Sequence, residues 1–390
     1  MSRKGTQSFM DRSQFTSHDT GRLVRTPDGH LAFVPSPLPP KIDIPFELMR
    51  RLSEADRAVG TLAGIGRILP NPHLLTHPFL RREAVLSSRI EGTEASATDL
   101  ALFEAAGSPS SDQTDVREVS NYVDALRYGL KRLDELPLSL RFLREVHGKL
   151  MADVRGGTRA PGEFRHVQNW IGPGGSRIDT ATYVPPPVQE MHAALDHFER
   201  YLHDRSPMPV LLRAALIHYH FEAIHPFLDG NGRVGRLLIA FLLHVENVLD
   251  QPLLYLSAFF ERHRREYYHR LLDVSMSGAW HDWIDFFLRG VTEQANDAVR
   301  RTRDLLDLSD SYRRRLASAR NAGVLSLLVD QLFAIPATTI SSVAAELQMS
   351  YPAAKKNVQK LVGMHILTPR RGKRGSIYVA EDVLRIIEAS

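Results

Sequence analysis

Residues 225–236 read His225-Pro226-Phe227-Leu228-Asp229-Gly230-Asn231-Gly232-Arg233-Val234-Gly235-Arg236. An apolar run with helical spacing precedes this string, from Leu211 to Phe221, and a second apolar run follows it, from Leu237 to Leu243. The pattern predicts two buried helices joined by a loop rich in glycine and asparagine. We expect the end of the loop to lead directly into the N-terminus of the second helix.

A loop in this position is suited to binding phosphate. The first amides of a helix lack acceptors within the helix and lie at the positive end of its dipole, so they favour anions. Gly230 and Gly232 allow the backbone to approach a ligand and to form an anion-binding nest. Arg233 and Arg236 are three residues apart, so both guanidinium groups can face one phosphate chain.

Two residues of the same string add reactive groups. Asp229 supplies a hard oxygen ligand of the kind that Mg²⁺ uses when it bridges phosphates. His225 is the candidate proton acceptor, because an imidazole titrates near physiological pH. Together these residues predict a site of nucleotidyl or phosphoryl transfer. A zinc site made by His218, His220 and His225 is the less favoured alternative, because two residues that are two apart point to different faces of a helix.

The string matches, position for position, the signature HPFx[D/E]GNGRxxR of the Fic family (filamentation induced by cAMP). The resemblance extends to 162–171 and 183–187, which are similar to the flap of that family, and to 280–287, which is similar to one of its downstream helices. It implies a mostly α-helical protein: a Fic core with a small β-hairpin flap, plus a C-terminal winged-helix domain. Most members of the family transfer AMP from ATP to a hydroxyl of a target protein, and some remove it.

The resemblance also assigns roles to single residues. It implies that His225 deprotonates the target hydroxyl, that Asp229 binds Mg²⁺, and that Arg233 and Arg236 hold the β- and γ-phosphates of ATP. Pyrophosphate would then leave as the α-phosphorus is attacked. The nucleotide-binding set that it implies is Gly230, Asn231, Gly232, Arg233, Val234, Gly235 and Arg236, with Tyr267 and Tyr268 beside the nucleoside. Ordinary helix packing stays open as an alternative for at least one of the two tyrosines, because adjacent helical residues do not share a face.

A second feature that resembles the family lies upstream. Ser87-Ser-Arg-Ile-Glu91-Gly92 fits its inhibitory signature [S/T]xxxE[G/N]. A carboxylate at Glu91 would compete with the γ-phosphate for Arg236, and ATP would then bind in a non-productive pose. Gly92 is suited to ending the helix after the glutamate. In some relatives this glutamate instead helps to remove AMP, so both reactions are expected here.

The flap at 163–186 is the expected site for the target protein. A short hairpin edge can align an extended peptide and so present its hydroxyl. A packed surface hairpin is the alternative. Trp170 is expected to anchor the flap to the core.

The C-terminal region combines helical runs with a basic strand–loop–strand, which predicts a winged helix. Seven basic residues and no acidic ones lie between Leu347 and Ala380, so this segment has a net charge of +7. The whole chain has a net charge of +4, so the remainder has a net charge of −3. The basic residues are Lys355, Lys356, Lys360, Arg370, Arg371, Lys373 and Arg374. Contact with DNA and contact with protein, including a homodimer, both stay open. A DNA-binding transcriptional regulator that uses the Fic core as a nucleotide sensor is therefore the alternative function. The intact His225 favours an enzyme.

Composition sets the wider limits. The 390 residues contain no cysteine, which excludes a disulfide scaffold, a Cys-ligated zinc site and a thiol nucleophile. We expect no membrane contact and a cytoplasmic location. The predicted organisation is a mobile tail at 1–35, an N-terminal helical region with the inhibitory helix at 36–112, a Fic core at 113–298, a linker helix at 299–318 and a winged helix at 319–390.

Overall fold

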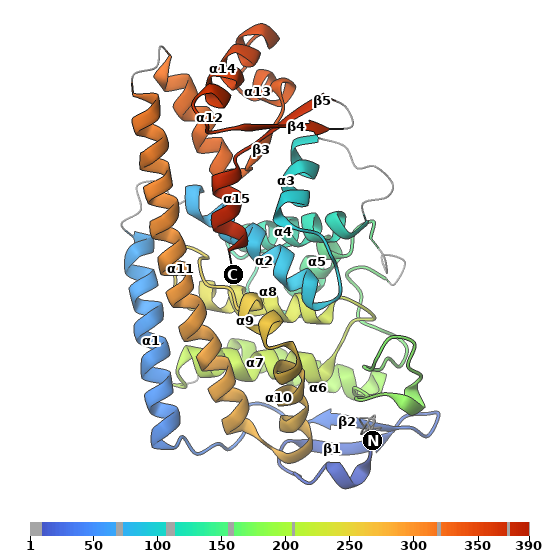
Figure 1. The fold of residues 1–390 in the computed structure, drawn as a ribbon. Coiled ribbons are helices and arrows are strands. Elements are labelled where there is room, and N and C mark those ends of the chain that lie inside the picture. Colours follow the sequence, from blue (N-terminus) through green and yellow to red (C-terminus); the bar gives the residue numbers. More distant parts are fainter. Residues whose placement is uncertain are drawn as a thin grey trace, which may run out of the picture. The chain divides into compact units, whose positions relative to one another are not determined.

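The fold was analysed in a computed structural model of the chain. The structure describes residues 10–67, 73–106, 114–154, 160–204, 207–317, 321–372 and 375–389. The first nine residues of the predicted tail and Lys373 and Arg374 of the predicted winged helix lie outside these ranges. The chain is mostly helical, as the sequence predicts (Figure 1).

Two compact units interleave along the chain. The first consists of Met1–Arg57, Asp124–Val248 and Phe259–Thr292, and the second of Ala58–Val123, Leu249–Ala258 and Glu293–Ser390. Helices α1 (Phe46–Arg67), α4 (Thr114–Arg132), α9 (Ser257–Arg262) and α11 (Trp280–Leu316) contribute residues to both. The predicted linker helix at 299–318 is part of α11, which runs without a break through the predicted boundary at 298.

The first unit is built around a pair of interior helices, α7 (Val210–Ile224) and α8 (Asn231–Val245). Both are buried along almost their whole length, and a helix that is apolar on every side belongs in an interior. α5 (Leu140–Leu150) buries one face against α8, where Phe142 meets Phe241 edge-to-face at 5.0 Å between ring centroids. The remaining helices of this unit are α6 (Val188–His203) and α10 (Arg264–Ser277).

The prediction of a mobile tail is wrong for residues 10–35. This segment contains a 3₁₀ turn, η1 (Arg12–Gln14), and an antiparallel hairpin of β1 (Gly21–Arg25) and β2 (Leu31–Pro35), with Leu23 opposite Phe33. Phe33 is 1% exposed, and its amide donates to the Val184 oxygen at the end of the predicted flap. The hairpin is therefore ordered by burial of β2.

The second unit contains α2 (His73–Ile90), α3 (Ala97–Ala106) and the C-terminal elements α12 (Ala322–Ala334), β3 (Ala337–Thr338), α13 (Ile340–Glu346), α14 (Tyr351–Gly363), β4 (Thr368–Gly372), β5 (Gly375–Val379) and α15 (Glu381–Glu388). The three strands form an antiparallel sheet in the order β3–β5–β4. α13 begins at Thr339, whose hydroxyl accepts from the Ser342 amide at 3.1 Å. The three helical runs and the strand pair that the sequence predicts are present as α12, α13, α14 and β4–β5, whereas β3 and α15 are elements that the sequence did not predict.

Polar pairs between buried side chains join α2 to its neighbours in the second unit. Arg81 is 1% exposed and makes bidentate hydrogen bonds to the Glu104 carboxylate of α3, at 3.0 and 3.1 Å. Glu83 is 3% exposed and accepts from the Tyr122 hydroxyl at 2.9 Å and from the Ser257 hydroxyl at 2.5 Å. Removing one partner of such a pair leaves a buried polar group unsatisfied, so these contacts hold α2 in place.

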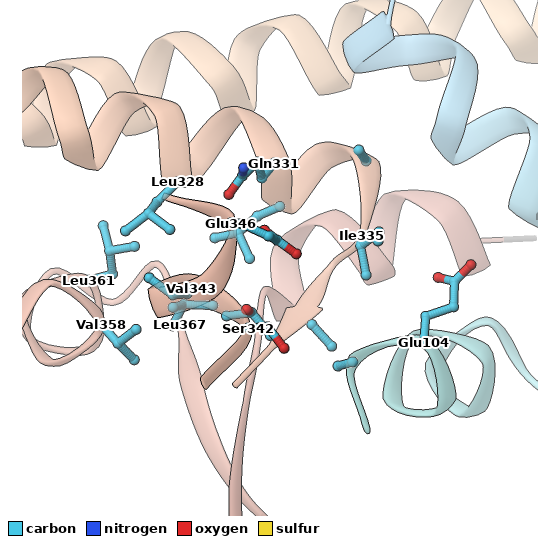
Figure 2. Close-up of a pocket in the computed structure, with 15 residues that line it drawn as sticks. Glu104, Leu328, Gln331, Ile335, Ser342, Val343, Glu346, Val358, Leu361 and Leu367 are labelled. Carbon is cyan, nitrogen blue, oxygen red and sulfur yellow. The ribbon is translucent and has the colours of Figure 1, made fainter. Parts of the chain in front are cut away.

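A cavity of about 120 Å³ lies inside the second unit (Figure 2). Its lining is mainly aliphatic and comes from α3, α12, β3, α13, α14 and Leu367, with Glu104 and Glu346 as its carboxylates. Among the described residues, no helix is both long and apolar enough to cross a bilayer.

Candidate active site

The loop between α7 and α8 begins and ends at residues in the left-handed backbone region. His225, which follows the last residue of α7, has φ 50° and ψ 61°, and its amide still donates to the Phe221 oxygen at 3.0 Å. Gly230 has φ 78° and ψ 5° and precedes the first residue of α8. A non-glycine residue in this region is uncommon and marks a place where the surroundings fix the backbone.

The side chain of His225 is oriented by its own helix. Its Nδ1 atom lies 3.3 Å from the Glu222 main-chain oxygen. A carbonyl oxygen can only accept, so this contact places the imidazole proton on Nδ1. The lone pair is then on Nε2, which is the atom suited to act as a base.

Donors from outside the loop bind its main-chain oxygens. Each of the following contacts ends on a carbonyl of residues 225–229: Arg165 Nε to His225 at 3.1 Å, the Arg165 amide to Pro226 at 2.9 Å, Asn169 Nδ2 to Phe227 at 2.9 Å and to His225 at 3.3 Å, and His147 Nε2 to Asp229 at 3.0 Å. Because the carbonyls are bound by the scaffold, the loop backbone has one defined conformation.

Asn231 closes the loop from inside. Its Oδ1 accepts from the Phe227 amide at 2.8 Å, and its Nδ2 donates to the Phe227 oxygen at 2.8 Å. Both ends of the carboxamide therefore hold the loop. A contact between Asn231 and a phosphate, which the family resemblance implies, would have to use the main-chain amide in the first turn of α8.

The two arginines of the string lie on α8 and are buried. Arg233 is 4% exposed and Arg236 is 3% exposed. Arg233 lies 3.7 Å from the Asp229 carboxylate. Burial, with a smaller contribution from the positive charge of Arg236, lowers the pKa of His218 to about 3. Two cations thus share the interior of this helix end with an imidazole that stays neutral.

Val234 and Gly235 take part in helix packing. Val234 is fully buried, and the Gly235 oxygen lies 3.0 Å from Nδ1 of His218. A Cβ atom at Gly235 would lie 2.2 Å from a carboxylate oxygen of Glu222, so α7 and α8 approach closely here. A role of either residue in nucleotide binding stays a prediction.

The donor set fits Mg²⁺ held jointly with phosphate. The Asp229 side chain is 38% exposed, and its Oδ1 accepts from the Gly230 amide at 2.7 Å. The described residues contain no group of three or more carboxylate, histidine or cysteine side chains that could hold a metal ion alone. Mg²⁺ characteristically binds through one or two carboxylates together with substrate phosphates. Asp229 matches that pattern, and a His218–His220–His225 zinc site is not formed.

Tyr267 and Tyr268 lie in different environments. Tyr267 is 1% exposed and stacks on Phe260 at 4.4 Å, with its hydroxyl 2.8 Å from Nε2 of His218. Tyr268 is 41% exposed. Packing in the core therefore accounts for the position of Tyr267. Tyr268 is the more exposed of the two and is better placed to contact a ligand.

The predicted flap is a loop with one antiparallel bridge, between Ile171 and Tyr183, and a 3₁₀ turn, η2 (Ile178–Thr180). The expectation that Trp170 anchors it is wrong, because Trp170 is 41% exposed and its indole donates to the Ser176 oxygen within the flap. Tyr183 is the anchor, with 7% exposure and a 2.8 Å bond from its hydroxyl to the Ala223 oxygen of α7.

The residues of the inhibitory signature lie at the end of α2. Ser87 is fully buried, while Glu91 and Gly92 are exposed in the turn that follows Ile90. Gly92 has φ 97°, and its amide donates to the Arg89 oxygen at 3.0 Å. The glycine therefore ends the helix after the glutamate, as expected.

Two segments of the chain match known family models. Residues 137–243 match the family model described as "Fic/DOC family", and residues 49–131 match "Fic/DOC family N-terminal". These two segments are therefore a Fic N-terminal region and a Fic domain. The Fic match covers α5, the flap, α7, the loop and most of α8, which are the elements that build the site.

Curated relatives match part of the chain at lower than 30% identity. The chain is 29% identical over 168 residues to Protein adenylyltransferase Fic of Drosophila ananassae, covering 42% of this chain and 30% of that protein. It is 29% identical over 171 residues to the protein of the same name from Aedes aegypti, covering 43% and 29%. The match thus spans less than a third of the length of these Fic proteins.

Solved Fic structures share the fold. A Fic family protein from Desulfovibrio desulfuricans aligns with a TM-score of 0.58 at 16% identity, over 88% of this chain and 98% of that one. A Fic-domain signaling protein from Bacteroides thetaiotaomicron aligns with a TM-score of 0.51 at 21% identity, over 65% and 98%. At these identities the likeness concerns the fold alone.

Three Fic-core residues that hold the loop were missed by the sequence analysis. His147, Arg165 and Asn169 all donate to its carbonyls, although Arg165 and Asn169 lie in a segment recognised only as flap. Arg165 is 1% exposed, and burial lowers its pKa to about 10, so it remains a cation at neutral pH. A buried arginine is normally paired through hydrogen bonds that hold its surroundings in place. The sequence around Arg165 has no periodicity that would predict its burial.

Proposed function

We propose that the chain is a protein adenylyltransferase, which moves AMP from ATP to a serine, threonine or tyrosine hydroxyl of a target protein. The observation that carries this proposal is the position of His225, whose Nδ1 faces the Glu222 oxygen at the start of a loop that leads into the N-terminus of α8. Arg233 and Arg236 follow on the same helix. The relatives named protein adenylyltransferase support this reaction class.

The reaction follows from these positions. Nε2 of His225 takes the proton of the target hydroxyl, and the oxygen forms a bond to the α-phosphorus of ATP. The bond from the α-phosphorus to the oxygen that bridges it to the β-phosphate breaks, and pyrophosphate leaves. The amides of the first turn of α8, with Arg233 and Arg236, stabilise the negative charge. When bound at Asp229, Mg²⁺ supplies further neutralisation of the phosphate oxygens.

Glu91 is proposed as an inhibitor of this reaction. Its exposed carboxylate would engage Arg236 in place of the γ-phosphate and hold ATP in a pose in which the hydroxyl cannot attack in line. The buried contacts of Arg81 and Glu83 fix α2, which gives the carboxylate a defined position on its own unit. Removal of AMP, with Glu91 orienting water, is the related second activity.

The flap is proposed to hold the target. An extended peptide beside the Ile171–Tyr183 bridge would add backbone hydrogen bonds and present its hydroxyl without strict demands on sequence. Tyr183 fixes one side of this bridge to α7, so the peptide would be held in register with the catalytic loop.

Labelled ATP tests the reaction class. Purified protein is incubated with Mg²⁺ and ATP that carries ³²P at either the α- or the γ-position, and the label on protein is measured. We expect label from the α-position and none from the γ-position, because AMP is transferred and pyrophosphate leaves. Label from the γ-position would show phosphoryl transfer instead, and label retained in His225→Ala would exclude His225 as the base.

A second candidate function rests on the C-terminal region. α13 and α14 form a helix–turn–helix followed by the β4–β5 hairpin, and we interpret this as a winged helix. Lys355 and Lys356 are exposed on α14, as is Arg371 on β4, whereas Arg370 is paired with Glu381 at 2.8 Å. These cations would meet the phosphates of DNA and make the chain a regulator that senses nucleotide through its Fic core.

Binding of duplex DNA at several salt concentrations separates the two functions. A regulator would bind DNA with an affinity that falls with salt and changes with ATP, and the double variant Lys355→Gln/Lys356→Gln would reduce the salt dependence by about two counterions. Binding that does not change with ATP would leave the adenylyltransferase as the function. A homodimer and a cytoplasmic location stay predictions from the sequence.

A further inference from the structure

His147 links the catalytic loop to the beginning of the flap. It lies on α5, is 1% exposed, and uses both ring nitrogens. Nδ1 accepts from the Gly162 amide at 2.9 Å, and Nε2 lies 3.0 Å from the Asp229 main-chain oxygen. Since Nδ1 accepts, the proton must be on Nε2, which donates to the Asp229 oxygen.

The imidazole also packs flat against the loop. Its ring stacks on Phe227 with 3.8 Å between centroids and 8° between planes. A Cβ atom at Gly230 would lie 3.5 Å from Nε2 of His147 and 2.9 Å from the sulfur of Met151. The loop from Phe227 to Gly230 therefore has little room to move toward α5.

The hydrogen bond to Asp229 acts on the peptide between Asp229 and Gly230. The oxygen of that peptide is held by His147, and its N–H donates to the Asp229 carboxylate at 2.7 Å. The orientation of the peptide plane therefore sets the direction of the carboxylate. It also sets the left-handed conformation at Gly230, from which α8 begins.

We propose that His147 is a positioning residue: its Nε2–H fixes the Asp229–Gly230 peptide, and so aims the Asp229 carboxylate at the metal–phosphate position, while Nδ1 separately fixes the start of the flap at Gly162. The inference depends on the proposed function only for the identity of the ligand, Mg²⁺ with ATP. The link from His147 to the Asp229 carboxylate and to Gly162 rests on the geometry of the loop alone.

Two substitutions separate the role of Nε2 from that of Nδ1. The carboxamide of His147→Gln reaches the position of Nε2 and can still donate to the Asp229 oxygen. That of His147→Asn reaches the position of Nδ1 and can still accept from the Gly162 amide. Both variants lose the stacking on Phe227, so this common loss cancels when they are compared.

Hydrogen exchange of the full chain without ligand is the first measurement. We expect faster exchange in peptides covering 226–232 for His147→Asn and in peptides covering Gly162 for His147→Gln. His220→Asn is the control, because His220 is equally buried and its Nε2 hydrogen-bonds the Ser36 oxygen instead. It should lower stability without accelerating either region. Equal acceleration of both regions in both His147 variants would overturn the proposal in favour of packing alone.

Calorimetric binding of ATP at low and high Mg²⁺ is the second measurement. We expect His147→Asn to weaken binding at low Mg²⁺ by about tenfold, the size of one lost hydrogen bond, and His147→Gln to stay near wild type. In an Asp229→Ala background the effect of His147→Asn should vanish, because the carboxylate that it aims is gone. If the ATP affinity of His147→Asn depends on Mg²⁺ in the same way as that of wild type, His147 does not position the metal ligand Asp229 and the proposal is overturned. Wild type that binds Mg²⁺–ATP but transfers no AMP would contradict the proposed function and leave this inference standing.

Discussion

Nδ1 of His225 lies 3.3 Å from the main-chain oxygen of Glu222, in the last turn of the helix that precedes the catalytic loop. The backbone of His225 leaves that helix in a left-handed conformation, yet its ring is held by the same helix. The proposed base is therefore positioned by local backbone geometry, while the groups that we propose to face phosphate are carried by the next helix.

The first prediction concerns His225. His225→Ala should lower transfer of α-label to protein by about 10²-fold or more, because proton transfer in the transition state is lost. ATP affinity should change little, since the phosphates are held by α8. Label incorporation and calorimetry on the same preparation check both parts. A parallel loss of ATP binding would mean that the variant has disturbed the loop.

The second prediction concerns Glu91. Glu91→Gly should raise the rate of auto-modification from α-labelled ATP, because the carboxylate that we propose as a competitor for Arg236 is removed. Melting temperature should be almost unchanged, since Glu91 is exposed. Glu94→Gly, at another exposed residue a few positions on, is the control. An unaltered rate in Glu91→Gly would reject the inhibitory role.

The third prediction separates conformation from crowding at Gly230. Gly230→Ala should cost about 1–2 kcal/mol for the left-handed backbone, plus the cost of a 2.9 Å contact with Met151. Gly29→Ala is a matched control, because Gly29 has φ 85° and a Cβ atom added there would have nothing within 4 Å. Urea denaturation should therefore show a larger loss in Gly230→Ala than in Gly29→Ala. Equal losses would show that Met151 moves aside freely.

The fourth prediction concerns pH. Burial, with a smaller contribution from Arg236, lowers the pKa of His218 to about 3. Burial, with a smaller contribution from His197, lowers the pKa of His220 to about 4. Between these values and about 6.5, the unfolded chain binds protons that the folded chain does not. The unfolding free energy should therefore fall as pH drops below about 6.5, by about 1.4 kcal/mol per pH unit for each histidine.

Denaturation of wild type and His220→Gln across this range checks the slope. The glutamine can still donate to the Ser36 oxygen but cannot take up a proton, so the slope should be shallower in the variant. Substitution of the exposed His18 by glutamine is the control. Identical slopes in His220→Gln and wild type would show that His220 does not contribute.

The helices of this chain were largely predictable from periodicity. α7 and α8 follow from their apolar runs, and α14 begins beside Pro352 as expected for the first turn of a helix. The hairpin at 21–35 was missed although its turn contains Pro27-Asp28-Gly29, a recognised turn sequence. The surrounding polar residues concealed that signal.

Contacts between distant residues could not be predicted. His147 is 82 residues from Asp229, Arg165 is 60 from His225, and Asn169 is 58 from Phe227. The string at 225–236 identifies the site because its glycines, arginines and histidine have local geometric roles. The donors that fix its backbone carry no such local mark, and only the folded chain brings them to it.

The binding of the loop carbonyls by Arg165, Asn169 and His147 has a consequence for protein engineering. The twelve residues 225–236 are not sufficient to transfer the site to another protein. On another pair of helices, their main-chain oxygens would lack the donors that fix the loop backbone. A designed transferase would need α5 and the base of the flap as well as the signature, which makes the smallest transferable module a stretch of about a hundred residues, on the scale of a small domain.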